Sequence, residues 1–214
     1  MASAHIDDAK ALRERSRSAA QRLGIEIPEA LPLLDEEVEP RAQDEVLSRA
    51  LALHVVIAAA YGFPRDRALA WIRREGVEDA LTGREGEFLR VGGDERAAEL
   101  QHAVDALWGL AWALELVEEL DFSSAPADEL VERFPDLNAD EPADDTAARA
   151  SLRDVPALAA QLDLAYCLHW AVREALNQGR SVSGVVDEEE LRCRRLALEW
   201  LLTTDPWEDI TLDT

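Results

Sequence analysis

The chain has 214 residues, of which 45 are acidic and 22 basic, and its formal net charge is −23. Hydrophobic residues make up 48% of it and charged residues 31%, proportions that are ordinary for a globular protein and exclude wholesale disorder. Because nucleic-acid backbones are bound by clustered Lys and Arg, the acidic excess argues against a nucleic-acid partner and against an anionic membrane surface.

The first 40 residues predict one helix followed by an extended strap. A charged amphipathic helix is expected over about 7–23, closed by Gly24. The segment 25–40 contains three prolines, which prevent a long helix, so it is expected to run extended along the bundle. Its apolar side chains are expected to pack there: Ile25, Ile27, Leu31, Leu33 and Leu34.

The stretch 41–61 predicts the second strong helix. Its first turns are polar, with Glu45 and Arg49 in the favourable acid-then-base order, four residues apart. Beyond Ala50 it is apolar nearly all round, so this helix is expected to be central. A shorter helix is expected over 65–74.

Capping signals predict the next elements. Thr82 and Glu85 have the spacing of a capping box, which opens a short helix. Asp94 is expected to cap one long helix that runs to about Leu120. A short helix over 126–134 follows.

The stretch from Asp154 to Gly179 predicts a central helix. Asp154 has the residue type of an N-cap, Pro156 is tolerated in the first turn, and Gly179 suits the position after the C-cap. Apolar residues cover well over half of the circumference, which requires burial against two or more neighbours. The remaining stripe has members three or four residues apart: Asp163, Tyr166, Trp170, Arg173 and Asn177.

This stripe has two interpretations. Tyr166 and Trp170 supply a flat apolar wall, Arg173 can stack on Trp170, and Asp163 can accept hydrogen bonds, so the stripe could line a pocket. The same residues could form a seam between helices, with the acid paired to a neighbouring Arg. His169 lies on the apolar edge; metal ligation would need further ligands, and a lone His there is usually a hydrogen-bonded core residue.

The last strong helix is expected over 187–203. Arg194 falls in its apolar face, whereas Arg192, Arg195 and Glu199 form a narrow stripe that is expected to face solvent. A buried guanidinium must find an anion, so Arg194 either locks the C-terminal tail through a salt bridge or faces an anionic ligand. The candidate carboxylates are Asp163, Asp209 and Asp213.

These elements predict an all-α, single-domain orthogonal helical bundle over 1–214, with an extended Pro-rich N-terminal strap and an ordered C-terminal tail. The acidic, Pro-containing segment 136–146 is expected to be a mobile loop. The sequence has no apolar signal core and no run long enough to span a bilayer, so a cytoplasmic location is expected. No metal or cofactor is expected, because GxSxG, Gly-rich phosphate loops and CxxC spacings are missing.

Short motifs lie along most of the chain in a specific pattern. The N-terminal half contributes Leu23-Gly24-Ile25, Ile27-Pro28, Leu31-Pro32, Arg41, Glu45, Arg49, Leu81-Thr82 with Glu85, and Trp112-Ala113-Leu114. The C-terminal half contributes Asp163-Leu164, Tyr166, Leu168-His169-Trp170-Ala171, Arg194, Ala197-Leu198, Trp200-Leu201, Trp207, Asp209 and Asp213-Thr214. The pattern resembles a bacterial family, domain-of-unknown-function family 4272. The resemblance implies a cytosolic helical protein and carries no assigned activity.

Two residues depart from that family's pattern. In the family an Arg precedes the Leu-His-Trp triplet and an acid precedes the Arg of the last helix, whereas here these positions hold Cys167 and Cys193. We expect the two thiols to be neighbours that replace a buried Arg–acid pair. Their helices would then lie side by side.

The leading functional prediction is a non-catalytic cytosolic protein that binds another macromolecule, as an accessory or immunity-type protein with a basic protein partner. It rests on the missing catalytic signatures and the acidic charge, although a GC-rich or salt-tolerant host produces a similar composition. The alternative is an enzyme or small-ligand binder with a pocket formed by the C-terminal helices and tail. The candidate binding residues are Arg41, Glu45, Arg49, Asp163, Tyr166, His169, Trp170, Arg173, Arg194, Trp200, Trp207, Asp209 and Asp213.

Overall fold

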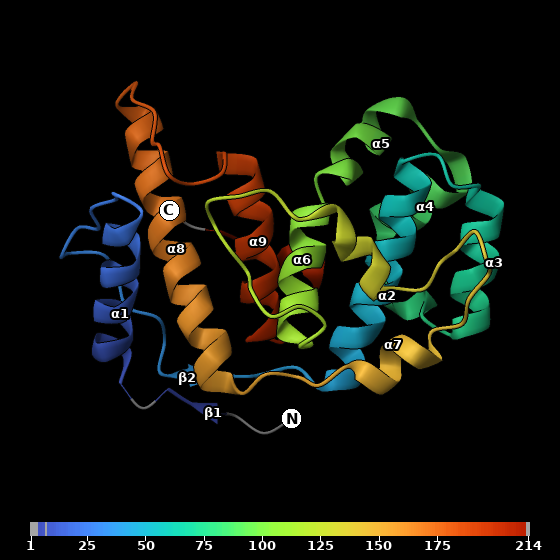
Figure 1. The fold of residues 1–214 in the computed structure, drawn as a ribbon, viewed down its shortest axis with the longest axis horizontal. Coiled ribbons are helices and arrows are strands. Elements are labelled where there is room, and N and C mark those ends of the chain that lie inside the picture. Colours follow the sequence, from blue (N-terminus) through green and yellow to red (C-terminus); the bar gives the residue numbers. More distant parts are fainter. Residues whose placement is uncertain (1–3, 7, 213–214) are drawn as a thin grey trace. The chain divides into compact units, whose positions relative to one another are not determined.

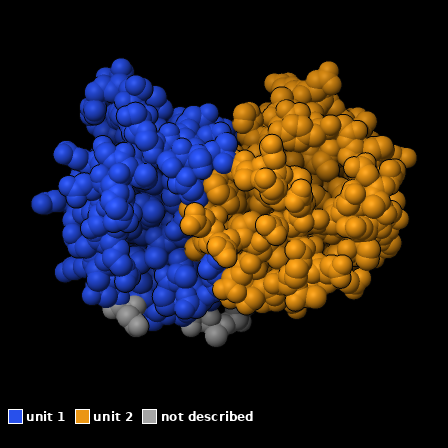
Figure 2. All heavy atoms as spheres, viewed as in Figure 1, with its two compact units in different colours: residues 1–41, 121–125, 153–214 blue, residues 42–120, 126–152 orange. Residues whose placement is uncertain are grey.

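The computed structural model describes residues 4–6 and 8–212, which are mostly helical (Figure 1). By their internal contacts they divide into two compact units (Figure 2). Unit 1 comprises residues 1–41, 121–125 and 153–214, and unit 2 comprises residues 42–120 and 126–152. The predicted all-α class is confirmed. The orthogonal packing and the single-domain organisation stay predictions.

Unit 1 is organised around α8 (Val155–Asn177), which packs against α1 (Ala9–Arg22) and α9 (Glu188–Leu201), as Figure 1 shows. The predicted start of α8 is confirmed, because the Asp154 side chain accepts a hydrogen bond from the Ala157 N–H at 2.9 Å. Gly179 follows its C-cap in the left-handed region, with φ 68°. Local signals therefore fix both ends of this helix.

The N-terminal part of unit 1 contains a two-stranded antiparallel pairing that the sequence pattern did not predict. Strand β1 (Ala4–His5) pairs with β2 (Glu37–Val38). Between α1 and β2 the chain has no helix; Ile25 and Leu31 are buried, but Leu33 is 41% exposed, so its predicted packing was wrong. Two residues per strand are too few for an alternating pattern to be read from sequence.

The C-terminal part of unit 1 begins with a capping box that the sequence analysis did not identify. The Asp187 side chain accepts from the Glu190 N–H at 2.9 Å, and the Glu190 carboxylate accepts from the Asp187 N–H at 3.3 Å. After α9 the tail forms a short 3-10 helix, η3 (Trp207–Asp209).

Unit 2 is organised around α2 (Gln43–Ala60), which is buried on nearly every side, as its composition predicted. The predicted capping box is confirmed, with Thr82 Oγ1 accepting from the Glu85 N–H at 3.2 Å. The other elements of this unit are α3 (Arg65–Glu75), η1 (Glu78–Ala80), α4 (Gly83–Val91), α5 (Asp94–Gln101), α6 (Val104–Ala113), η2 (Asp128–Arg133) and α7 (Asp144–Arg149).

The single long helix predicted from Asp94 to Leu120 was wrong, because the chain forms α5 and α6 with a break at 102–103. Helix α5 has no buried residue, whereas α6 is buried along most of its length. At the end of α6, Glu115 adopts a left-handed φ of 55°, and the Leu116 N–H bonds to the Ala111 carbonyl at 2.9 Å. This bond and the left-handed residue form a Schellman-type helix ending. Glu115 stands at the position that Gly usually occupies, so the sequence contains no glycine that would predict the end of the helix.

The segment between α6 and α8 also differs from the prediction. The helix expected over 126–134 is the 3-10 helix η2, and the acidic segment continues into α7, which was not predicted. Trp71 Nε1 donates to the Glu141 carbonyl at 2.8 Å, and Arg74 pairs with Asp140 at 2.7 Å. Side chains of α3 thus hold residues of the predicted loop, whose mobility stays a prediction.

Candidate functional site

The most unusual side chains of unit 1 form a buried arginine cluster, which we define as Arg13, Asp163, Tyr166, His169 and Arg195. Helix α1 contributes Arg13, α8 contributes the next three residues and α9 contributes Arg195. In α1 the buried positions are 9, 12, 13, 16 and 20, a helical stripe that carries Arg13 into the interior. The cluster therefore lies where the three packed helices of the unit meet.

Arg13 and Asp163 form a bidentate ion pair within the cluster. Their side chains are 2% and 1% exposed. The Nη2 of Arg13 donates to Oδ1 of Asp163 at 2.8 Å, and its Nε donates to Oδ2 at 3.1 Å. Arg13 also donates to the carbonyls of Leu31 at 2.8 Å and Pro32 at 2.7 Å. Two helices and the segment before β2 are therefore joined through one guanidinium.

Tyr166 lies between the two arginines of the cluster. The Arg13 guanidinium is 5.5 Å and the Arg195 guanidinium 4.8 Å from the centroid of its ring, within the range of cation–π attraction. Burial raises the pKa of the Tyr166 phenol, and the two positive charges act in the opposite direction. The ring therefore separates two like charges.

His169 is fully buried and neutral at physiological pH. Burial, followed by the repelling charges of Arg195 and Arg173, lowers its pKa to about 4. Arg195 Nη1 lies 3.1 Å from His169 Nδ1, and because a guanidinium can only donate, Nδ1 is the acceptor and Nε2 carries the hydrogen. The Nε2 atom is buried without a hydrogen-bond partner. The expected hydrogen-bonded core histidine is thus confirmed for one nitrogen.

Arg195 was expected to face solvent, and this prediction was wrong. Its side chain is 4% exposed, and it donates to the Glu199 carboxylate at 3.0 Å as well as contacting His169. The acid one turn along α9 and the aromatic face of Tyr166 together make this burial tolerable.

The two cysteines are free and buried. The Sγ of Cys167 lies 4.0 Å from Asp163 Oδ2, and the Sγ of Cys193 lies 3.7 Å from Glu189 Oε1. Burial, followed by the charge of Asp163, raises the pKa of the Cys167 thiol to about 12, so that thiol is a poor nucleophile. Helices α8 and α9 do pack together, while direct contact between the thiols stays a prediction.

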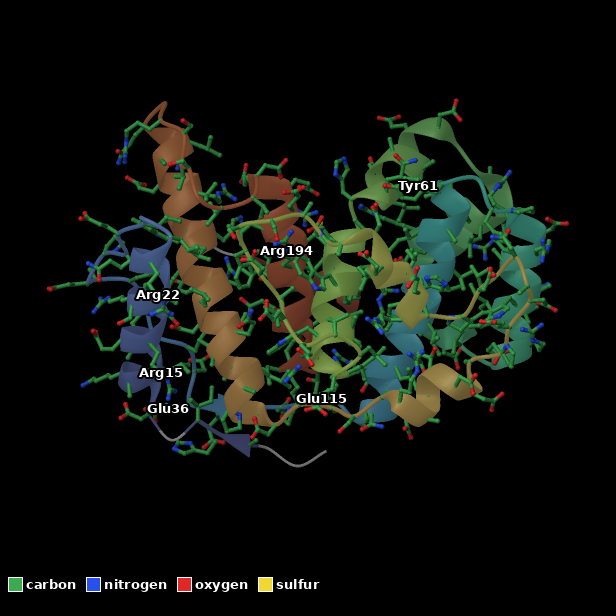
Figure 3. The ribbon with its side chains drawn as sticks, viewed as in Figure 1. Arg15, Arg22, Glu36, Tyr61, Glu115 and Arg194 are labelled. Atoms are coloured by element: carbon green, nitrogen blue, oxygen red, sulfur yellow. The ribbon has the colours of Figure 1, made fainter. Side chains whose placement is uncertain are left out.

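Arg194 does not pair with the acid of α8. Its Nη1 donates to the Asp121 carbonyl, and its Nη2 donates to the Ser124 carbonyl at 2.8 Å (Figure 3 labels this residue on α9). Of the three carboxylates that the sequence offered to Arg194, Asp163 is bound by Arg13 instead, so this candidate was wrong. For the second candidate, Asp209, the structure describes a hydrogen bond from its backbone N–H to the Pro206 carbonyl. The third candidate, Asp213, lies outside the described residues.

Arg41, Trp200 and Trp207 meet at the C-terminal end of α9. The Arg41 guanidinium lies 4.1 Å from the centroid of the Trp200 ring, and its Nε donates to the Trp200 carbonyl at 2.8 Å. Arg41 Nη2 also donates to the Asp205 carbonyl. Trp207 packs edge-on against Trp200 with a centroid distance of 5.4 Å. The tail therefore closes on α9, as expected.

In unit 2, Arg49 on α2 forms a buried bidentate pair with Glu85. Arg49 Nη2 lies 2.6 Å from Oε1 and Nη1 lies 2.7 Å from Oε2, and both side chains are at most 5% exposed. The same carboxylate completes the capping box by accepting from the Thr82 N–H at 2.9 Å. The other candidate in this unit, Glu45, lies on the first turn of α2.

Trp170 and Arg173 lie apart from the arginine cluster in their contacts. Arg173, expected to stack on Trp170, is exposed and lies 3.7 Å from Glu188. Trp170 lines a groove of about 590 Å³ together with Glu174 and Arg180. The stripe predicted along α8 is thus divided between a helix seam at Asp163 and a groove wall at Trp170.

A family model described as Domain of unknown function (DUF4272) matches residues 12–210. The chain belongs to this family. No curated protein and no solved structure matches it significantly. The motif residues of the DUF4272 pattern, including Arg41, Arg49, Asp163 and Arg194, hold parts of the fold together through their internal contacts.

Three residues of this DUF4272 chain that carry these contacts were missed or misassigned from the sequence. Arg13 is the partner of Asp163, and the helical spacing of the small and apolar residues beside it was the signal for its burial. Glu85 was identified as a capping residue but not as the partner of Arg49. Arg195 was assigned to the surface, and no local signal marks its burial.

Across residues 4–6 and 8–212, His, Cys, Asp and Glu side chains nowhere form a group of three that could hold a metal ion. Within the same residues, each helix is too short or too polar to cross a membrane.

Proposed function

We propose that this chain is a non-catalytic protein that binds another macromolecule, and that it acts as a bacterial accessory or immunity-type protein. The observation that supports this function is the use of its unusual polar groups. Asp163, Arg49 and Arg195 each form an ion pair within the chain, so these charged groups stabilise the fold. An enzyme would instead direct such groups at a shared cavity.

The charge of the chain supports a basic partner. A net charge of −23 favours a basic protein and disfavours nucleic acid or an anionic membrane. A cytoplasmic location is part of the proposal, since free, buried cysteines suit a reducing compartment.

Affinity capture tests this proposal. The tagged full chain is expressed in cells of its source, crosslinked and purified at low and high salt, with a tagged acidic protein of similar net charge as the control. We expect one basic protein to be retained in a stoichiometric complex, with less retained at high salt. Recovery of the chain without a protein partner, or of the same proteins with the control, would contradict the proposal.

A small-ligand site is the second candidate, because Trp170 lines a groove with Glu174 and Arg180. A flat indole beside charged side chains suits an aromatic or charged metabolite. The melting temperature of the chain against a metabolite library tests this alternative. A true ligand at a hundred times its dissociation constant adds about 2.7 kcal/mol of stability, and the rise is expected to disappear in Trp170→Ala.

A further inference from the structure

Unit 2 contains an open groove of about 720 Å³ that none of the sequence motifs marked. One wall is the C-terminal end of α2 with the turn that follows it, including Ala58, Tyr61 and Phe63. The other wall is η2 and the segment after it, including Val131 and Phe134. The lining is mostly apolar, and the volume is in the range of sites that hold a drug-sized ligand or a few side chains of a peptide.

The floor of the groove is formed by the rings of His54 and Phe134 and carries no charge at physiological pH. His54 stacks on Phe134 with ring centroids 5.1 Å apart, and its Nε2 lies 3.1 Å from the Pro135 carbonyl. Burial lowers the pKa of His54 to about 4, so the ring is neutral at physiological pH. His54 Nε2 is thus engaged by the backbone, and the uncharged ring together with Phe134 gives the groove an aromatic lining, which suits an apolar side chain.

The rim of the groove carries exposed apolar side chains. Tyr61 is 66% exposed at the end of α2, where Figure 3 labels it, and Val131 is 53% exposed on η2. Among the described residues five large hydrophobic side chains are exposed, and these two line the same groove. Paired exposed apolar groups around a hollow mark an interaction site, and Tyr is among the residues that contribute most to binding.

The electrostatics of the groove favour a cationic occupant. Glu132, Asp136 and Glu141 belong to its lining. The negative end of the α2 dipole also lies there, and the last turn of α2 contains no basic residue to compensate it. The nearby cation Arg67 stacks on Phe63 at 5.0 Å and donates to backbone carbonyls beyond it, so it is engaged within the unit.

We propose that this groove docks a short segment of a basic protein, with a bulky apolar side chain against the floor and flanking Lys or Arg residues near Glu132 and Asp136. This assignment rests on the proposed function and gives it a site and a partner chemistry. The apolar floor favours the bulky apolar side chain of the segment. The acidic side chains and the negative end of α2 favour its flanking Lys or Arg residues.

Peptide selection on the intact chain tests the assignment. A display library of random short peptides is selected on the wild-type protein, and enriched peptides are measured by fluorescence polarisation. We expect enrichment of sequences with Lys or Arg around an aromatic residue or Leu. Tyr61→Ser and Val131→Ser should each raise the Kd about tenfold or more, whereas Glu132→Lys should slow association and weaken its salt dependence.

Matched control variants remove an exposed apolar side chain elsewhere. Val91→Ser on α4 and Leu176→Ser on α8 make the same type of change, at positions 72% and 49% exposed, and should leave the Kd unchanged within about twofold. Far-UV circular dichroism and the melting temperature establish that all variants are folded. Enrichment of acidic or uncharged peptides, no enrichment, or equal binding by the Tyr61→Ser variant and wild type would overturn the assignment.

The captured partner separates the two proposals. If a basic protein is captured but binds the Tyr61→Ser/Val131→Ser double variant with the wild-type Kd, the groove assignment is wrong while macromolecular binding stands. If selected peptides depend on Tyr61 but no partner is captured from cells, the groove binds such segments and the proposed function is wrong.

Discussion

The central helices of the two units each carry one buried charged residue and one buried histidine, but the contacts of the two histidines differ. Helix α8 carries a buried charge, Asp163, and a buried neutral histidine, His169; helix α2 carries Arg49 and His54 in the same roles. In unit 1 the histidine contacts a further arginine, Arg195, whereas in unit 2 the histidine contacts a phenyl ring and a backbone carbonyl.

The difference extends to the surroundings of each histidine, which are charged in unit 1 and apolar in unit 2. Unit 1 places two buried arginines, Arg13 and Arg195, against Tyr166, and both make contacts within the unit. Unit 2 has an apolar groove floor around His54, with exposed Tyr61 and Val131 on the rim. The buried ion pair of unit 1 joins α1 to α8, while the exposed apolar rim of unit 2 is the surface where we propose that a partner docks.

The largest expected effect comes from breaking the ion pair of unit 1. Asp163→Asn leaves the Arg13 guanidinium buried without a carboxylate, which costs about 3–5 kcal/mol in comparable cases. Urea unfolding followed by Trp fluorescence and circular dichroism measures the loss.

The control removes both charges of that pair. The Arg13→Met/Asp163→Leu double variant has no uncompensated buried charge, so it should be more stable than Asp163→Asn. If the double variant is instead no more stable than Asp163→Asn, the pair contributes through the contacts of Arg13 with the Leu31 and Pro32 carbonyls rather than through charge.

The ion pair of unit 2 should respond differently, because Glu85 has two tasks. Glu85→Gln keeps a side-chain acceptor for the Thr82 N–H but removes the charge that faces Arg49. Glu85→Ala removes both and is expected to cost about 3 kcal/mol or more, with the Gln variant losing less. Equal losses in urea unfolding would mean that the capping contact contributes nothing.

Acid should weaken both units through their histidines. Each folded-state pKa is about 4, below the unfolded value of about 6.5, so between these values the unfolded chain binds more protons. The stability that each neutral ring contributes is present above pH 6.5 and is lost as the pH falls towards 4. For His54 the loss is about 2 kcal/mol between pH 7 and pH 5.

Glutamine variants assign this loss to its source. In His54→Gln and His169→Gln the replaced side chain no longer titrates. The unfolding free energy of each variant should therefore fall less steeply between pH 6.5 and pH 5 than that of the wild type. Parallel curves for wild type and a variant would show that the replaced ring does not titrate in this window.

The smallest expected effect compares the capping boxes of the two units. Thr82→Ala and Asp187→Ala each remove a side chain that accepts from the third backbone N–H of its helix, and each should cost about 1 kcal/mol. The melting temperature measures both losses. Ser at either position retains the cap and should restore most of the stability.

The sequence by itself determined the helical class and the elements whose signals are local. The composition of α2 required burial, Asp154 and Gly179 delimited α8, and the spacing of Thr82 and Glu85 predicted the start of α4. Each signal acts within a few residues, through a cap, a turn or a stripe on one helix. The sequence named Arg41, Trp200 and Trp207 as separate candidates, and the structure brings them together.

Tertiary structure decided which buried charges meet. Arg13 and Asp163 are separated by 150 positions. From sequence position alone, several carboxylates could have paired with Arg194 or with Arg195 of α9. The ending of α6 at Glu115 likewise depends on contacts that compensate an unfavourable backbone conformation. Pairing energies between distant groups depend on the folded geometry, and a linear pattern does not encode that geometry.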